Sequence, residues 1–438
     1  MNLKKISIKE IYIQNFKNIE YGYLDSFDLK KLKQDPFSKE NHVLGIYGQN
    51  GSGKTAVIEG LAILKLVLSG EPIPESVFQG ISTDKEIASF RFTFFIESKT
   101  MICFTSYSFQ LDKNKRNVTQ EKISVKTYSD QWEKVINLLE VGETDLFAPK
   151  KINRLIKKSS KESYFKMNLY KELANKLSCS YLFYQETYQI ISSLYKDQLL
   201  GDILEYLTYF GKHSLLILQN LYVGLKQIPL IRTENEYRQL NLLDSNQVTK
   251  EEFQDITKSI NQLNHVLKPI IPYMHLEIRK MESIDTIDFE ILSIKEGHTI
   301  PLAQESSGIK KILSILHALL IMFNDPLVTL AIDELDSGIF EFLLGEVVRI
   351  LEESNQGYLF FTSHNLRPLE RLHKESIIFT TVNPKERFIR LHNVRSSSNL
   401  REQYFRNIIL KEQKEELYLD GNPYEMKHYL KKAYHVQD

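Results

Sequence analysis

The chain has 438 residues and no net formal charge, since 56 Lys and Arg residues balance 56 Asp and Glu residues. A hydrophobic fraction of 42% and a charged fraction of 26% exclude a disordered or fibrous protein. The neutral balance excludes a general attraction to nucleic acid or acidic membranes, so such binding would require a local patch. The apolar stretch 312–323 is too short to span a bilayer, and residues 1–10 lack a signal-peptide core, so we expect a cytoplasmic protein.

The first part of the chain predicts strands around a glycine-rich loop. Residues 6–13 alternate apolar and polar side chains, which is typical of a half-buried strand. A second strand at 42–47 leads into a glycine cluster, and apolar residues three or four apart predict a helix over 56–68. Short aromatic and β-branched runs then predict an antiparallel sheet with strands at 90–96, 101–107 and 123–127.

Helical patterns dominate the middle of the chain. Strand signals fade over 131–231, and 202–225 carries apolar residues every three or four positions. Thr249 and Glu252 form a capping-box pattern at the start of a further helix, which Pro269 ends.

The remaining elements alternate between strands and helices. Strands are predicted at 275–279 and 286–294, followed by a helix over 309–323. The nearly continuous apolar run 327–332 is typical of a parallel strand buried on both faces, and 358–362 looks like its neighbour. The charged, amphipathic tail from Ser396 predicts helix.

The glycine cluster fits the phosphate-loop pattern GxxxxGK[ST]. The curled backbone of such a loop points N–H groups at phosphate oxygens, and the following helix presents its positive end. Lys54 then reaches the β- and γ-phosphates, and Thr55 offers its hydroxyl to Mg²⁺. The pattern therefore predicts a nucleotide site rather than a simple turn, formed by Gly48, Gln49, Asn50, Gly51, Ser52, Gly53, Lys54 and Thr55.

Polar residues follow both of the later buried strands. Asp333 and Glu334 come directly after 327–332, where a first carboxylate holds the Mg²⁺ shell and a second orients and deprotonates the attacking water. His364 follows the strand 358–362 and can hydrogen-bond the γ-phosphate and the water. Taken alone, the two acids would be a capped strand end and His364 an ordinary surface histidine; the phosphate loop favours the functional interpretation.

Ser306, Ser307 and Gly308 precede the apolar helix over 309–323. Serine hydroxyls and free N–H groups at a helix start can bind a second anion, although N-capping alone explains them equally well. The order of the motifs decides between these interpretations: phosphate loop, long insertion, serine-glycine helix start, Asp-Glu strand, histidine strand.

This set resembles the ATP-binding-cassette ATPases of the non-transporter branch, the SMC, RecF and OLD-like group. Residues 11–17, IYIQNFK, resemble the opening strand of those heads. Ser307 and Ile309 depart from the usual signature and resemble the variant of OLD-like AAA family ATPases in phage-defence operons. The matching motifs are Walker A at 48–55, the signature at 306–308, Walker B at 327–334, the D-loop at 335–338 with Asp336, and the switch histidine His364.

The resemblance implies an α/β fold: an ABC-type P-loop NTPase head with a mixed sheet, flanking helices and an antiparallel β subdomain. It divides the chain into the N-terminal half of the head at 1–130, a helical insertion at 131–274, the C-terminal half at 275–395 and a helical tail at 396–438.

The resemblance also implies ATP and Mg²⁺ as cofactors, with Thr55 and Asp333 at the metal and Lys54, Glu334 and His364 as catalytic residues. Two copies in a homodimer, or in a higher homo-oligomer, would sandwich ATP. The signature residues Ser306, Ser307 and Gly308 of one copy would then touch the γ-phosphate held by Lys54 of the other.

Three roles stay open for such an ATPase. It could regulate a separate effector, a nuclease or toxin, as in phage defence; it could act on DNA itself, as RecF-like repair ATPases do; or it could be a nucleotide-gated scaffold with negligible turnover. The insertion lacks the heptads of an SMC coiled coil and the CxxC of a zinc hook, which disfavours chromosome tethering. No membrane role is expected.

One basic segment bears on the partner. Residues 150–176 contain nine Lys or Arg and two Glu, with Tyr164, Phe165 and Tyr170 interleaved. Such a segment can neutralise phosphates while its aromatic rings stack on bases, so it predicts a possible DNA contact. The alternatives are a dock for an acidic effector and a solvated helix face.

Overall fold

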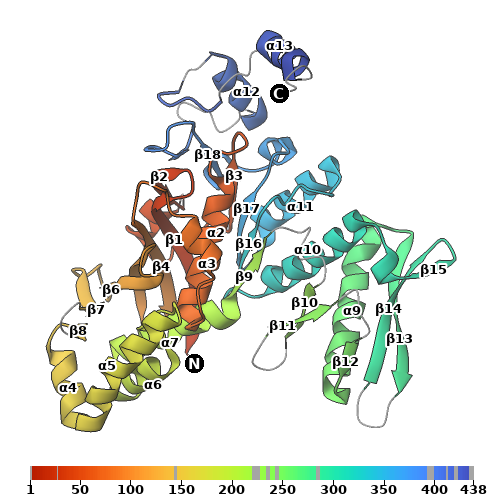
Figure 1. Cartoon of the computed structure of the whole chain (residues 1–438). Helices are drawn as coiled ribbons and strands as arrows, with labels where there is room; N and C mark the ends of the chain where they lie inside the picture. The colour runs from red at the N-terminus through yellow and green to blue at the C-terminus, as the bar shows by residue number, and fades with distance from the viewer. Residues whose placement is uncertain are drawn as a thin grey trace.

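In this computed structural model, the described residues are 2–26, 28–142, 146–219, 227–232, 237–241, 246–282, 287–391, 399–410, 413–418 and 423–433. An antiparallel sheet and a mostly parallel sheet lie side by side, with helices around them (Figure 1).

The antiparallel sheet has seven strands in the order β2-β1-β4-β5-β6-β7-β8. Its central strands carry the aromatic and β-branched runs that predict strands, and alternate residues such as Phe90, Phe92 and Phe94 are buried. The strands are β1 (Leu3–Phe16), β2 (Ile19–Asp25), β4 (Ile87–Ser98), β5 (Ile102–Asp112), β6 (Asn117–Tyr128), β7 (Ile136–Val141) and β8 (Phe147–Ala148).

The second sheet has six strands in the order β19-β18-β3-β17-β16-β9, and every pair except β18·β19 is parallel. Both faces are buried, as the continuous apolar runs predict. The strands are β3 (Val43–Tyr47), β9 (Leu215–Leu218), β16 (Thr329–Ile332), β17 (Tyr358–Thr362), β18 (Ile377–Thr380) and β19 (Phe388–Ile389).

Helices cover the sheets on several sides (Figure 1). Their bounds are α1 (Leu29–Leu32), α2 (Lys54–Ser69), α3 (Glu75–Gln79), α4 (Lys151–Ser159), α5 (Lys161–Lys176), α6 (Gln185–Leu194), α7 (Leu199–Tyr209), α9 (Lys250–Ile270), α10 (Ser307–Asn324), α11 (Glu341–Ser354), α12 (Leu400–Leu410) and α13 (Pro423–Ala433).

Helix α2 lies between the two sheets. Its apolar residues share one core with the antiparallel sheet and with Leu44 and Ile46, on one face of β3. The alternate residues Val43 and Tyr47 point to the other face and join a second core with α10, α11 and α12. The period of two along β3 therefore divides its side chains between two cores.

A third core forms beside α10. Helix α9 packs against β13 (Met274–Glu282) and β14 (Ile287–Lys295), and its capping box is present as predicted: Thr249 N–H donates to Glu252 Oε2 at 2.9 Å, and Glu252 N–H to Thr249 Oγ1 at 3.3 Å. The other strands of this region are β10 (Gln227–Arg232), β11 (Tyr237–Asn241), β12 (Asn246–Val248) and β15 (His298–Pro301).

The segment 131–274 is less helical than its pattern predicts. Its strands β7 and β8 extend the antiparallel sheet, and β9 forms an edge of the parallel sheet beside β16. The helical interpretation of 202–225 is therefore wrong at Leu215–Leu218, where four consecutive apolar residues form β9. Residues 220–225 of that stretch lie outside the described residues, as do Thr286 and Ser396.

Helix α10 is longer than the apolar stretch 312–323 suggests. Its 18 residues are apolar enough to cross a membrane by length and composition alone, and 50% of that window is buried inside the protein. Its buried residues pack against β16 and α9.

The expected fold class, α/β with a mixed sheet, flanking helices and an antiparallel sheet, is confirmed. β17 lies between β3 and β16 and is parallel to both. Because the carboxyl ends of parallel strands meet at one edge, the residues that follow these three strands lie close together.

Candidate functional site

The loop after β3 curls at its glycines. Gly51 and Gly53 have φ of +74° and +97°, which side chains with a Cβ rarely adopt, and Gly53 is the N-cap of α2. Ser52 Oγ donates to Gln49 O at 2.6 Å and also contacts Thr380 Oγ1 on β18. These contacts fix the loop to the sheet. The N-terminal end of α2 follows the loop directly and lies at the expected phosphate site.

Lys54 lies across this loop. Its ammonium donates to Gly48 O at 2.8 Å and to Gln49 O at 3.0 Å. Burial lowers the pKa of Lys54 to about 8, although the charges of Asp333, Asp336 and Glu334 oppose the shift. These three carboxylates all come from the segment that follows β16, two strands away from β3 in the sheet.

Asp333 connects the loop to the strand ends. Its Oδ1 accepts from Thr362 Oγ1 at 2.6 Å and lies 3.4 Å from Thr55 Oγ1, and the residue is only 6% exposed. The arrangement fixes one buried carboxylate between the start of α2 and the end of β17.

Glu334 has an unusual backbone conformation, with φ of +52° in the left-handed region. Three hydrogen bonds hold it there: its N–H donates to Thr362 Oγ1 at 2.8 Å, and its carbonyl accepts from Lys311 Nζ at 3.1 Å and from Ser337 N–H at 3.0 Å. Lys311 lies on α10 and is 5% exposed. Its burial lowers the pKa of Lys311 more than the nearby acidic residues raise it. A strained position held by buried neighbours is typical of a functional site.

Asp336 organises the segment after β17. Its carboxylate accepts from the N–H of His364 at 3.2 Å and from that of Asn365 at 3.0 Å. Partial burial and the charge of Lys54 lower the pKa of His364, while Asp336, Glu334 and Asp333 oppose the shift. The net shift favours the neutral imidazole, in which one nitrogen donates and the other accepts.

The serine-glycine element begins α10. Ser306 caps the helix by accepting from Ile309 N–H at 3.3 Å, and both Ser306 and Ser307 are exposed. Gly338 has φ of +80°, and a methyl group there would lie 3.5 Å from Gly308 Cα and 3.6 Å from Lys311 Cδ. The expected signature and D-loop segments therefore pack against each other within one chain.

The structure thus brings Lys54, Thr55, Asp333, Glu334 and His364 to one edge of the parallel sheet. Ser306, Ser307 and Gly308 join them only indirectly, through the D-loop. Sequence reasoning missed Thr362 and Lys311. A hydroxyl at the end of a buried strand is a weak signal for the first; nothing in the sequence points to the second, because its contact with Glu334 is purely tertiary.

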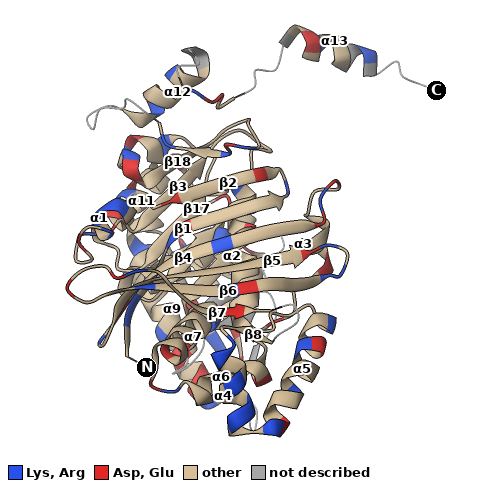
Figure 2. Cartoon of the chain, turned by 90° about the vertical axis from the view of Figure 1, so that its left-hand side faces the viewer, with Lys and Arg blue, Asp and Glu red and all other residues tan. Residues whose placement is uncertain are grey.

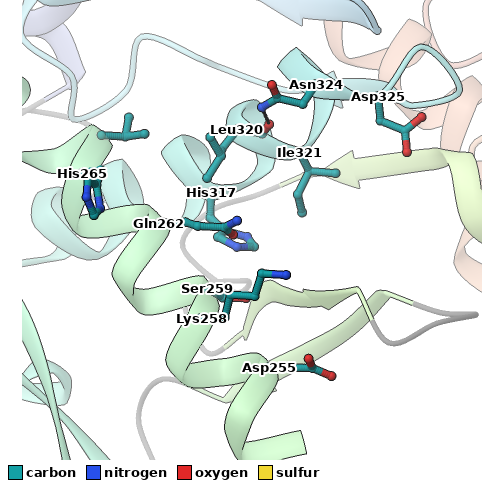
Figure 3. Close-up of a pocket in the computed structure, with 11 residues that line it drawn as sticks. Asp255, Lys258, Ser259, Gln262, His265, His317, Leu320, Ile321, Asn324 and Asp325 are labelled. Atoms are coloured by element: carbon teal, nitrogen blue, oxygen red, sulfur yellow. Dashed lines mark hydrogen bonds between the residues drawn. The ribbon is translucent and has the colours of Figure 1, made fainter.

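A separate cavity of about 590 Å³ lies between α9 and α10. Gln262 and His317 line it from the two helices, with His265 and Lys258 along α9 (Figure 3). None of the predicted site residues lines this cavity, so it is distinct from the edge where Lys54 and Asp333 meet.

The oxygen atoms at that edge suit a hard divalent cation. Mg²⁺ takes one or two carboxylates together with hydroxyl, water and phosphate oxygens. The Thr55 hydroxyl and the Asp333 carboxylate, 3.4 Å apart, provide such a donor set. The residues present therefore fit a magnesium ion bound with nucleotide phosphates.

Strand, glycine loop and helix on a parallel sheet define a P-loop nucleotide-binding protein. The model of a family described as AAA domain (AAA_23) matches residues 10–297, more than half of the chain and including the glycine loop. The chain belongs to this AAA domain family.

Several solved structures are similar to this chain at low sequence identity. No curated protein sequence matches it. An Smc head bound to the C-winged helix domain of ScpA has 12% identity and a TM-score of 0.48, covering 88% of this chain and 97% of that one. The recombination mediator RecF with ATP has 14% identity and a TM-score of 0.36, covering 83% and 93%. The SMC head domain from Thermotoga maritima has 14% identity and a TM-score of 0.36, covering 88% and 99%.

Replacing Lys311 tests whether it positions Glu334. With Glu334 as the predicted catalytic carboxylate, we expect Lys311→Ala to lower the kcat of ATP hydrolysis about tenfold or more with little change in KM, because a small displacement of such a group is costly while the phosphate loop is untouched. Steady-state kinetics measures both constants. Lys311→Arg should restore part of the rate. Lys310→Ala is the matched control, since Lys310 Nζ donates to Ala303 O at 2.9 Å; an equal loss in both alanine variants would contradict the positioning role.

Proposed function

We propose that this protein is a cytoplasmic Mg²⁺-dependent ATPase of the SMC and RecF type, which hydrolyses ATP to ADP and phosphate and dimerises when ATP binds. The observation that carries the proposal is the convergence of the phosphate loop with Asp333 and Glu334, since phosphoryl transfer needs phosphate cradling, a metal ligand and a water-orienting base at one place.

Each residue has a distinct role in this proposal. Residues 48–53 present N–H groups to the phosphates, and Lys54 leaves its two carbonyl partners to contact the β- and γ-phosphates. Thr55 and Asp333 hold Mg²⁺, which would neutralise charge on the phosphate oxygens. The exposed Glu334 carboxylate orients the attacking water and accepts its proton. Neutral His364 donates a hydrogen bond to the γ-phosphate.

Dimerisation would complete the site. In this proposal, the exposed residues Ser306 and Ser307, together with Gly308, do not contact the nucleotide of their own chain. They contact the γ-phosphate of the nucleotide bound by the partner. The D-loop that packs against Gly308 continues into two large exposed aromatics: Phe340 is 76% exposed and Phe342 is 54% exposed. Exposed aromatic side chains beside a functional element are typical of an interface.

The dimer is tested by removing these rings. With a non-hydrolysable ATP analogue, we expect wild-type protein to shift to dimer mass in light scattering and the double variant Phe340→Ser, Phe342→Ser to stay monomeric while still binding nucleotide. Lys54→Ala should lose both properties, because it lacks the phosphate contact. Phe37→Ser removes an equally exposed ring elsewhere, at 70% exposure, and should dimerise normally. A wild-type protein that stays monomeric with nucleotide would contradict the proposal.

For the biological role we propose a sensor or regulator of a separate effector protein, a nuclease or toxin, in phage defence of the OLD-like kind. The alternative is a RecF- or SMC-like ATPase that acts on DNA in repair or recombination; the family match is equally compatible with both. ATPase assays with and without duplex DNA distinguish them: stimulation by DNA with no partner present supports the alternative, and co-purification of a nuclease or toxin supports the regulator. Single-turnover hydrolysis without multiple turnover would instead support a nucleotide-gated scaffold.

A further inference from the structure

The basic segment 150–176 forms two packed helices, α4 and α5, which we call the basic hairpin. It lies at the end of the molecule opposite α12 and α13, and Lys and Arg residues are spread along it (Figure 2). Nine basic and two acidic residues give this short segment a strong positive charge, although the chain as a whole is neutral. A positive surface on a neutral protein points to an acidic partner.

Two of its three aromatic rings are already occupied. Lys157 Nζ lies over the ring of Tyr164, 4.2 Å from the centroid, and both belong to the hairpin itself. The ring of Tyr170 packs against Tyr184, with centroids 6.3 Å apart. The expectation that interleaved rings stack on bases is therefore not supported at Tyr164 and Tyr170.

The remaining exposed apolar residues form a stripe on α5. Phe165 is 77% exposed and Leu169, one turn further, is 51% exposed. Lys161 lies one turn before Phe165 on the same side of the helix, and Glu172 lies beyond Leu169. Lys166 forms an ion pair with Glu162 at 2.5 Å. Single-stranded nucleic acids bind through stacked aromatic rings, and an aliphatic leucine offers none. A stripe at i and i+4 with a lysine one turn before it instead complements an amphipathic helix.

The hairpin is held firmly on the rest of the protein. Tyr181 Oη donates to Met167 O in α5 at 3.1 Å. The segment between α5 and α6 is fixed in turn by the buried Glu121 of β6. Its carboxylate accepts from Tyr181 N–H at 2.9 Å and from Leu182 N–H at 3.1 Å. In α4, Asn153 bonds both the N–H and the carbonyl of Phe147. A preformed surface loses less ordering free energy on binding than a mobile one.

We propose that the basic hairpin docks an acidic amphipathic helix of a partner protein, which covers Phe165 and Leu169 with its apolar side and pairs its carboxylates with Lys158 and Lys161. This goes beyond the proposed ATPase activity, and it requires no nucleotide at the distant loop.

The test uses fluorescence anisotropy with full-length protein and two labelled 18-residue peptides of identical composition. One peptide places leucines on one side of a Glu-rich helix, and the other scatters them around it. We expect the amphipathic peptide to bind on the order of tenfold more tightly than the scattered one, because only it buries an apolar face. Phe165→Ser with Leu169→Ser should abolish that preference, and Lys158→Glu with Lys161→Glu should weaken both peptides at least about tenfold.

Matched double variants serve as controls. Phe37→Ser with Val135→Ser removes side chains 70% and 67% exposed elsewhere, and Lys115→Glu with Lys385→Glu makes the same charge change at side chains 72% and 70% exposed. Both should bind like wild type. Equal affinity for the two peptides would overturn the proposal, as would preferential binding of a 20-base-pair duplex that is insensitive to Phe165 and Leu169. ATP hydrolysis in the Phe165 variant should stay unchanged, which separates failure here from failure of the ATPase assignment.

Discussion

Replacing Glu334 by Gln should lower ATP hydrolysis by about 10²- to 10⁴-fold, the contribution typical of a general base, while ATP binding is retained. The substitution keeps the shape of the side chain. The Thr362 and Lys311 contacts use only the backbone of Glu334, so its left-handed conformation should survive. Asp333 and Thr55 are untouched. The variant should therefore accumulate as an ATP-bound dimer, measured by phosphate release and light scattering.

The control for this experiment is Glu353→Gln, an exposed glutamate near the end of α11 whose side chain is 57% exposed. It should hydrolyse ATP at the wild-type rate. Normal turnover by the Glu334→Gln protein would show that another group activates the water and would remove Glu334 from the proposed site. Loss of ATP binding in the same protein would show that its carboxylate is structural.

Several parts of this site follow from local sequence, because strand and loop patterns depend on neighbouring residues. The glycine loop, the strand ending at Asp333 and the strand ending before His364 lie where their patterns predict, and the parallel order β3-β17-β16 makes them converge. Lys311 could not be predicted in the same way. Its bond to the Glu334 carbonyl depends on α10 lying against the D-loop, and a lysine beside another lysine in an apolar helix carries no signal of burial.

The errors in the fold have a physical origin as well. Leu215–Leu218 follows a helix and continues its apolar spacing, so periodicity alone cannot distinguish a buried strand from another helical turn. The partner β16 decides the conformation, because the backbone groups of this partly buried segment need hydrogen-bond partners and β16 provides them. Tyr164 shows the same limit for function: composition predicts an available ring, and the fold places Lys157 on it.

The sequence pattern also did not predict a buried charged cluster between β1 and β17. Lys9 on β1 has a side chain that is 0% exposed and pairs with Asp28 at 2.9 Å and Glu40 at 2.6 Å. The Tyr358 hydroxyl also donates to Glu40, and the Lys9 ammonium lies 4.8 Å from the Tyr358 ring centroid. In the alternating pattern of β1, a lysine reads as solvent-facing; here its ammonium joins the two sheets.

Removing that ammonium should be among the most destabilising changes in the protein. Lys9→Met keeps the aliphatic stem but leaves Asp28 and Glu40 buried with less compensation, so we expect a loss of about 3 to 5 kcal/mol in the free energy of unfolding at pH 7, measured with denaturant. Lys122→Met, which breaks an exposed pair with Glu140 in the same sheet, should cost less than about 1 kcal/mol.

Burial alone would raise the pKa of Glu40, but Lys9 and Lys5 outweigh it and lower the pKa from 4.5 to about 2. A depressed carboxyl pKa stabilises the fold above the unfolded value and loses that contribution as pH falls toward the folded value. The difference between wild type and Lys9→Met should therefore shrink from pH 4.5 toward pH 2, and a difference that stays constant across that range would show that the loss comes from packing rather than from the ion pair.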